Sequence, residues 1–262
     1  MRIAVTGGTG RIGGAAARLL AGTGEHEVLA LSSRTAPYDR PAALRSALAD
    51  VDTLVFVSSD GEAARVIVHH RNVLDAAAEC GIGHVVYLSG LDVAPDSPFC
   101  YAVTNGDTER QLRSSGLAHT IARTGLYTEF FLALVRQAAG DGTVALPAAD
   151  ARVSLVARDD VARCLAALAL REPTNGHHDV TGTESVPVEA VAAAAGYRYT
   201  DTTPGRFAEA LLRSGEELWW VYAYASMFAA IRQHRWESTS DAVTELTGRT
   251  PVTLSEVLAH QE

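Results

Sequence analysis

Short apolar runs alternate with longer amphipathic segments through the first half of the chain. Five runs, rich in branched residues, have the length of buried strands. They span residues 2–6, 28–31, 53–57, 84–88 and 118–122. The segments between them include helical patterns over 11–21, 41–49, 62–80 and 104–115. This alternation predicts a parallel sheet covered by helices on both faces.

The pattern changes after about residue 140. One short strand is expected at 152–156, followed by helical segments. These helices are expected at 158–170, 187–195, 204–213, 216–235, 240–247 and 254–260. We therefore predict a Rossmann-type, doubly wound sheet over residues 1–140. A small, mostly helical substrate lobe over 141–262, without an independent core, would complete the chain. Ligands of such sheets bind beyond the carboxyl ends of the strands, so the residues there are the candidates for function.

A glycine-rich motif follows the first strand and opens the first helix. Gly7, Gly10 and Gly13 have the spacing of a dinucleotide-binding loop. The first permits a tight turn, the second lets the backbone approach a diphosphate, and the third lets the helix pack closely. The helix N-terminus adds free N–H groups for the phosphates. The residues expected to hold the diphosphate are Gly7, Thr9, Gly10, Arg11, Ile12 and Gly13.

The residues after the second strand bear on the choice of dinucleotide. NAD-binding domains carry a carboxylate there for the ribose 2′-hydroxyl. This chain has no acid in that stretch and offers Ser33 and Arg34, which suit a 2′-phosphate, although Arg34 could also be a solvated loop residue. We therefore expect NADP(H) to be preferred, with NAD(H) possible. Ser58 and Ser59 end the third strand and are also expected at the cofactor.

Composition narrows the class of protein. The 262 residues include 47% hydrophobic side chains, enough for a sizeable core. The net charge of −9 argues against a nucleic-acid partner. All 22 basic residues are arginine, so no lysine can serve in catalysis. The three cysteines lack metal-ligand spacing, so we expect no metal and a cytoplasmic setting. We expect neither a membrane span nor a signal peptide.

Three segments resemble the NmrA-like, atypical short-chain dehydrogenase/reductases, with the type 2 quinone oxidoreductases nearest. They are TGGTGRIG at 6–13, HRNVLDAAAECGIGHVVYLSG at 70–90 and DTERQLRSSGL at 107–117. The resemblance covers most of the chain and is strongest up to about Phe131. It implies a Rossmann domain that carries NADPH across the strand ends, with a C-terminal lobe that forms the substrate pocket.

The chain departs from that family on the adenine side. Only a few residues separate the second strand from the helix expected at 41–49, so one helix and most of one strand of the family pattern are missing. The resemblance implies that Asp39 still reaches the adenine. We expect that end of the cofactor site to be more open than in the family.

The second departure concerns catalysis. Typical short-chain dehydrogenases use a serine after the strand placed here at 84–88, then Tyr-x-x-x-Lys. The resemblance maps these onto Ser89 and Tyr101, with Asn105 in the lysine position. Ser89 would polarise the substrate carbonyl or bond the cofactor. Tyr101 would donate a proton, pack on the nicotinamide or line the pocket, and Asn105 would contact cofactor or substrate. Without the lysine, a tyrosine keeps a pKa near ~10, which favours a reaction that needs little acid–base help.

Aromatic residues gather after the fifth strand and on one C-terminal helix. Those expected to contact substrate are Tyr127, Phe130, Phe131, Trp219, Tyr222 and Met227. Such a stripe could also be core or a partner surface. Flat apolar walls suit a small aromatic molecule.

Three function classes follow. The first is an NAD(P)H-dependent reductase of quinones or aromatic polyketide-like ketones, in a tailoring step of bacterial secondary metabolism such as antibiotic biosynthesis. The second is a non-catalytic dinucleotide sensor of the NmrA type, which the missing lysine supports. The third is a lyase or isomerase with little or no net redox. The pattern leaves monomer and homodimer open.

Overall fold

A six-stranded, fully parallel sheet forms the centre of the computed structural model, which describes residues 1–260. Its strands are β1 (Arg2–Val5), β2 (Glu27–Ala30), β3 (Thr53–Val57), β4 (His84–Gly90), β5 (His119–Thr124) and β10 (His177–Val180). They lie in the order β10-β5-β4-β3-β1-β2. The direction of winding reverses at β1, which creates the switch point at which such folds bind ligands. The predicted Rossmann-type sheet is confirmed.

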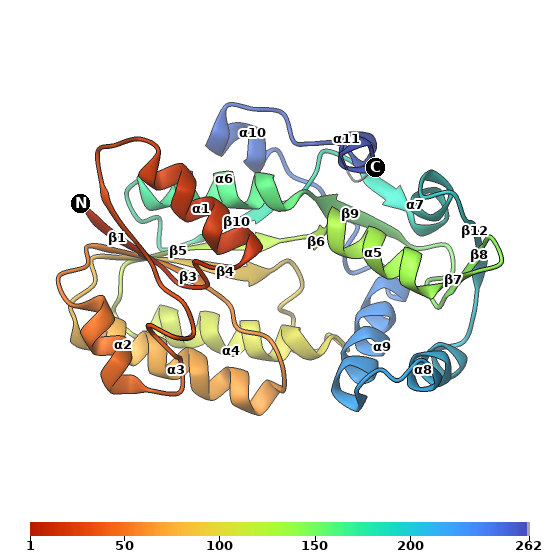
Figure 1. Ribbon diagram of the computed structural model, residues 1–262, viewed down its shortest axis with the longest axis horizontal. Helices are drawn as coiled ribbons and strands as arrows, with labels where there is room; N and C mark the ends of the chain where they lie inside the picture. The colour runs from red at the N-terminus through yellow and green to blue at the C-terminus, as the bar shows by residue number, and fades with distance from the viewer. Residues whose placement is uncertain (261–262) are drawn as a thin grey trace.

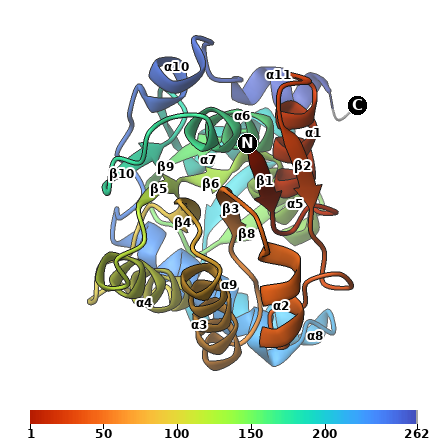
Figure 2. The same cartoon turned by 90° about the vertical axis from the view of Figure 1, so that its left-hand side faces the viewer.

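Helices cover both faces of this sheet (Figures 1 and 2). One face carries α1 (Arg11–Ala21) and α6 (Arg158–Ala169), with α10 (Ala242–Thr247) packed outside α6. The other face carries α2 (Pro41–Leu48), α3 (Ala63–Glu79) and α4 (Cys100–Ser114). A separate apolar cluster fills the space on each face. Burial on both faces explains why the strands read as continuous apolar runs.

The strand β2 lies at one edge of the sheet. In the common six-stranded Rossmann order another strand lies beyond this position. Here the chain passes from β2 through a short segment directly to α2. The structure therefore agrees with the shortened connection predicted from the sequence.

The opposite edge corrects the division of the chain at residue 140. Strand β10 pairs with β5, and α6 covers the same sheet, yet both follow residue 140. The chain leaves the sheet after β5, builds part of the lobe, and returns before completing it. A single boundary in the sequence therefore cannot separate the sheet from the lobe. The sequence did not predict this return, because β10 is too short and too polar to be recognised as a buried strand.

The lobe contains helices together with two three-stranded sheets, of which the sequence pattern predicted one strand, at 152–156. Its helices are α5 (Thr128–Ala138), α7 (Val188–Ala194), α8 (Pro204–Arg213), α9 (Leu218–Arg232) and α11 (Leu254–Ala259). One sheet contains β6 (Leu126–Tyr127), β9 (Arg152–Val156) and β11 (Ser185–Pro187), and the other β7 (Ala139–Gly140), β8 (Thr143–Leu146) and β12 (Arg198–Asp201). These elements enclose an apolar cluster that is separate from the two clusters on the faces of the central sheet. That the lobe does not fold by itself stays a prediction.

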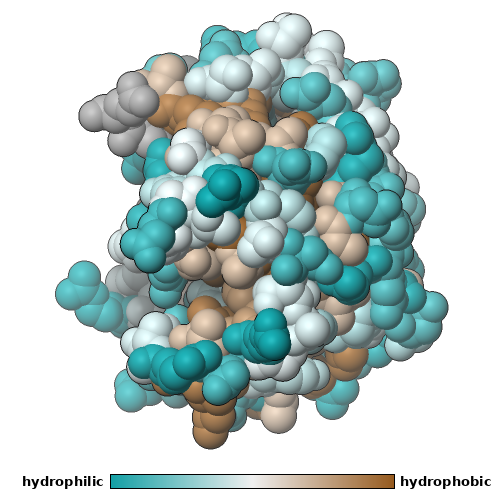
Figure 3. All heavy atoms as spheres, turned by 90° about the vertical axis from the view of Figure 1, so that its right-hand side faces the viewer, coloured by the Kyte–Doolittle hydropathy of each residue, from teal (hydrophilic) through white to brown (hydrophobic). Residues whose placement is uncertain are grey.

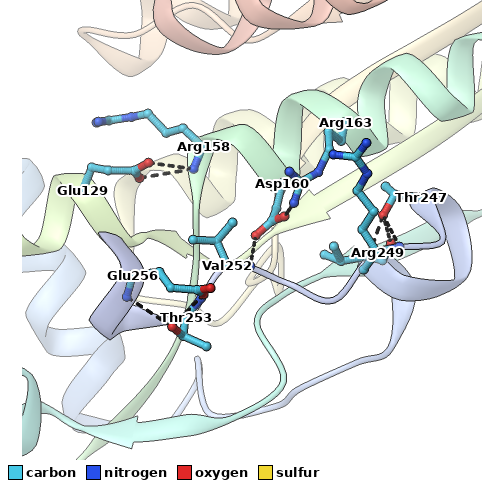
Figure 4. Close-up of polar contacts among 10 residues, drawn as sticks. Glu129, Arg158, Asp160, Arg163, Thr247, Arg249, Val252, Thr253 and Glu256 are labelled. Atoms are coloured by element: carbon cyan, nitrogen blue, oxygen red, sulfur yellow. Dashed lines mark hydrogen bonds and ion pairs between the residues drawn. The ribbon is translucent and has the colours of Figure 1, made fainter. Parts of the chain in front are cut away.

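Buried polar contacts join the lobe to the Rossmann helices. Asp160, fully buried in the first turn of α6, accepts from the backbone N–H of Val252 at 2.7 Å and pairs with Arg163 (Figure 4). The end of the lobe farthest from the sheet has a mixed surface, with hydrophilic and apolar residues interspersed (Figure 3). Apolar atoms at its lower edge lie at the level of α8 and α9.

No helix among residues 1–260 combines the length and the apolar character needed to cross a membrane.

Candidate active site

The glycine-rich loop between β1 and α1 has a backbone that only glycine can adopt at its critical positions. Gly7 has a φ of +61°, the left-handed region that side chains disfavour. A Cβ on Gly13 would lie 2.5 Å from the carbonyl oxygen of Gly7, and one on Gly8 would lie 2.7 Å from Ala30 Cα. The loop is therefore pulled tightly against α1 and β2, as a dinucleotide-binding turn requires.

The N-terminus of α1 is free to bind an anion. Gly10 is the N-cap residue and has no side chain to cap the helix, and the first turn contains no acidic residue. The side chain of Ile12 is buried in the core, so that only its backbone can face a ligand. Thr9 and Arg11 are exposed beside this turn. These features fit a diphosphate on the helix N-terminus, as the sequence predicted.

A groove of about 680 Å³ continues from Gly7 along the segment that follows β2. It is lined by Ser33, Arg34 and Asp39, the three residues that the sequence predicts at the adenosine end of the cofactor. Tyr38 and Arg65 also line the groove, although no motif identified them. The hydroxyl of Tyr38 donates to the carbonyl of Val57 at 2.8 Å, which ties this segment to the end of β3.

A second cavity, of about 370 Å³, lies beyond the ends of β4 and β5, between the sheet and α9. Its walls are mainly apolar and aromatic. They include Leu91, Phe99, Tyr101, Leu126, Tyr127, Phe130, Trp220, Tyr224, Met227 and Trp236. Ser58, Ser59 and Asp60 line both this cavity and the cofactor groove. The loop after β3 therefore forms the boundary between the two spaces.

Ser89, the last residue but one of β4, lines this cavity, but its hydroxyl hydrogen already takes part in a hydrogen bond. It donates to the carboxylate of Glu109 at 2.7 Å. Arg123 donates twice to the same carboxylate, at 2.9 and 2.6 Å, and Arg113 donates at 2.7 Å. Burial would raise the pKa of Glu109, but the hydrogen bonds from Arg123 and Ser89 outweigh it and hold that pKa below its usual range. In this arrangement Ser89 can accept a hydrogen bond from a ligand but cannot donate one.

Asn105 is held with its amide group at the cavity wall. Its Oδ1 accepts from the hydroxyls of Tyr87 at 3.1 Å and Ser58 at 3.4 Å. Its Nδ2 lies beside Gly90, where a Cβ would approach it to 3.0 Å. The oxygen is thus occupied by protein donors, which leaves the N–H₂ group as the donor available to a ligand.

Tyr101 lies at the same cavity, and its hydroxyl meets the loop after β3. The N–H of Gly61 donates to this hydroxyl at 3.0 Å. Burial raises the pKa of Tyr101, and the Gly61 backbone and the Trp219 indole offset that effect only in part. The side chain therefore joins α4 to the loop and stays protonated at neutral pH.

His70 holds the other end of that loop, a role the sequence did not suggest. Its Nε2 accepts from the Ser59 N–H at 3.0 Å, and its Nδ1 lies 2.8 Å from the Thr108 hydroxyl. Thr108 in turn donates to the Thr104 carbonyl at 2.9 Å, so Nδ1 must carry the proton. Burial, together with the neighbouring His69, lowers the pKa of His70 to about 3. Histidines in the middle of a helix more often face solvent, and only the burial seen in the structure shows that His70 does not.

The aromatic helix α9 presents a different face from the predicted one. Trp220, Tyr224 and Met227 line the cavity, at the spacing of a single helix face. Of the expected residues Trp219, Tyr222 and Met227, only Met227 lines it. The ring of Trp219 instead packs edge-on to Tyr101, with centroids 6.4 Å apart, and Tyr222 is 54% exposed. This helix is apolar on nearly every side, so the sequence alone does not indicate which side faces the cavity.

The prediction for Phe131 is also corrected. Phe130 lines the cavity, whereas Phe131 is fully buried in the lobe core and packs against Phe228. Consecutive residues on a helix point about 100° apart, and on α5 it is Phe130 that points to the cavity while Phe131 points to the core. Tyr127, the remaining expected residue, does line it.

Among the described residues, no group of three histidine, cysteine, aspartate or glutamate side chains is placed to bind a metal ion.

Comparison with known proteins identifies the family. A family model described as NAD(P)H-binding matches residues 7–172. Quinone oxidoreductase 2 of Escherichia coli is 35% identical over 136 residues, which are 52% of this chain and 47% of that protein. An NAD(P)H azoreductase of Xenophilus azovorans is 28% identical over 97% of this chain and 96% of its own length.

The fold agrees with these similarities. The crystal structure of the NADPH-dependent quinone oxidoreductase QOR2 of Escherichia coli, complexed with NADPH, has a TM-score of 0.90. Its sequence is 26% identical to this one, and the match covers 99% of each chain. The resemblance inferred from the motifs is thereby confirmed. The chain belongs to the NAD(P)H-binding family and is an NAD(P)-dependent oxidoreductase.

Proposed function

We propose that the protein reduces a quinone or an aromatic, polyketide-like ketone with NADPH, the acceptor lying flat in the aromatic cavity. The observation that carries this proposal is the meeting of the two spaces at the Ser58–Asp60 loop. An acceptor among the aromatic walls would lie next to the nicotinamide end of a cofactor in the groove. The relatives named for quinones and for azo compounds point to the same kind of flat, conjugated acceptor.

The residues present fit the cofactor. The loop around Gly13 leaves no room for a side chain, and the α1 N-terminus offers unpaired N–H groups. Ser33 and Arg34, both exposed in the groove, supply donors for a 2′-phosphate, and we infer a preference for NADP(H) from them. When bound, the nicotinamide supplies a hydride.

Asn105 is the residue we assign to orientation of the reactants. Its free N–H₂ group can donate to a ribose hydroxyl or to an acceptor oxygen, and Tyr87 and Ser58 fix it in place. Ser89 has a different role, because its own hydrogen is given to Glu109. It lies one residue before the end of β4 and offers only lone pairs to the site.

A quinone needs no strong acid in this site. Hydride addition gives a hydroquinone anion, whose negative charge is delocalised, and one proton from water completes the product. An aryl ketone gives a more basic oxygen and needs a donor such as Tyr101. The missing lysine therefore favours quinones over isolated ketones.

The test is NADPH and NADH oxidation by purified protein with quinones and aryl ketones, in parallel with Tyr101→Phe and Asn105→Ala. We expect Asn105→Ala to lower kcat/KM for quinones by about tenfold, the loss of one hydrogen bond. Tyr101→Phe should change quinone reduction by less than about threefold, while ketone reduction falls further. Tight cofactor binding without turnover of any acceptor would contradict the proposal and favour a dinucleotide sensor. Product formed without net cofactor oxidation would favour a lyase or isomerase.

A further inference from the structure

One positive charge lies in the aromatic cavity. Of the described residues that line it, Arg158 alone is basic. It is the first residue of α6 and is partly buried. Its guanidinium lies 5.7 Å from the centre of the Tyr127 ring, so it is stacked on the cavity wall rather than extended into solvent.

The nearest carboxylate does not neutralise this charge. Glu129 directs both of its oxygens to the backbone N–H of Arg158, at 3.1 and 3.2 Å, and so caps α6 (Figure 4). The side chain of Arg158 extends past that carboxylate. Within residues 1–260, the structure shows no ion pair or hydrogen bond to its guanidinium.

The electrostatic setting agrees with the geometry. Burial lowers the pKa of Arg158, Glu129 partly offsets this, and the nearby charge of Arg11 lowers it again. A partly desolvated guanidinium beside a second cation attracts an anion more strongly than one in water does. Neither of the two acidic residues in the cavity wall pairs with the Arg158 guanidinium. Asp92 is held by Ser97 and Arg235, and Asp60 is exposed on the loop shared with the groove.

We propose that Arg158 binds an acidic substituent, a sulfonate or carboxylate, on the aromatic substrate. This inference rests on the proposed function, since it names the class of acceptor for the same cavity. Arg158 lines the aromatic cavity, whereas the residues assigned to the diphosphate (Gly10, Arg11, Ile12 and Gly13) do not, which favours the substrate over the cofactor diphosphate as the anion's source. The fork of guanidinium donors matches both oxyanions. The Tyr127 ring would meanwhile stack against the aromatic body.

The binding test needs no turnover. Naphthalene-2-sulfonate and the neutral 2-naphthol are titrated into the protein, and quenching of tryptophan fluorescence is followed, since Trp220 and Trp236 line the cavity. We expect Arg158→Met to weaken sulfonate binding by about ten- to hundredfold, the range for a hydrogen bond to a charged group. Binding of 2-naphthol should change by less than about twofold. Arg206→Met removes the same charge from an exposed site on α8 and should leave both affinities unchanged.

Two further measurements separate the possible outcomes. The Kd of NADPH is measured for wild type and for Arg158→Met, and KM is measured for 1,4-naphthoquinone with and without a 2-sulfonate. An increase in KM confined to the sulfonated quinone supports the proposal. Equal effects on both probes, or a loss confined to NADPH affinity, would overturn it and assign Arg158 to the cofactor. Selective sulfonate binding without turnover would retain the anion site and reject the reductase function.

Discussion

The carboxylate of Glu109 is predicted to be the most important single charge in the site for stability. It is 1% exposed and takes hydrogen bonds from Ser89, Arg113 and Arg123. Glu109→Gln keeps the shape but places an amide among two guanidiniums. Removing one partner of a fully buried pair costs about 3–5 kcal/mol. The arginine side chains here are 43% and 18% exposed, so water screens part of that cost. We therefore expect a loss of about 2–4 kcal/mol.

Thermal unfolding followed by circular dichroism measures this loss, with urea titration as a second estimate. For a chain of this size the predicted loss corresponds to a fall in Tm of roughly 5–10 °C. Glu79→Gln is the matched control, because its pair with Arg45 has both side chains about half exposed. That change should cost less than about 1 kcal/mol. Equal melting temperatures for the two variants would refute the argument that burial of the Glu109 network stabilises the fold.

Two other predictions concern the cofactor loop and its support. Gly13→Ala should weaken NADPH binding by at least about tenfold, because its Cβ would meet backbone oxygens that cannot move aside, and calorimetric titration measures this. Gly205→Ala, where a Cβ meets nothing within 4 Å, is the control, and an unchanged Kd for Gly13→Ala would contradict the assignment. His70 has a pKa of about 3 in the fold against ~6.5 when unfolded, so the unfolded chain binds more protons between these values. Stability should therefore fall as the pH drops below about 6.5, by about 1.4 kcal/mol per unit from this residue, and His70→Gln should show a shallower decline in urea titrations between pH 6.5 and 4.5. Parallel curves would show that His70 is not buried in the neutral form.

The sequence predicted the features that follow from local rules. The glycine spacing identified the loop after β1 because a backbone turn of that kind tolerates no side chain at Gly13. The absence of an acid after β2 and the shortened connection that follows it could likewise be read directly.

The features it missed depend on tertiary packing. Strand β10 completes the sheet with a short, polar segment, so its pattern does not differ from that of a turn. The face of α9 towards the cavity is set by neighbouring elements, since apolar residues lie on nearly all sides of that helix. The commitment of Ser89 to Glu109 and the support of Ser59 by His70 join residues far apart in the chain. No spacing rule identifies such pairs.

The proposed function depends on direct hydride transfer from NADPH to an aromatic acceptor, which a single-turnover experiment can measure. The complex of protein and NADPH is mixed with 1,4-naphthoquinone under anaerobic conditions, and the nicotinamide absorbance is followed. We expect that one quinone is reduced for each NADPH oxidised, and that deuterium at the transferred position of the nicotinamide slows the step. A complex in which NADPH stays reduced in the presence of saturating quinone would contradict the proposed function.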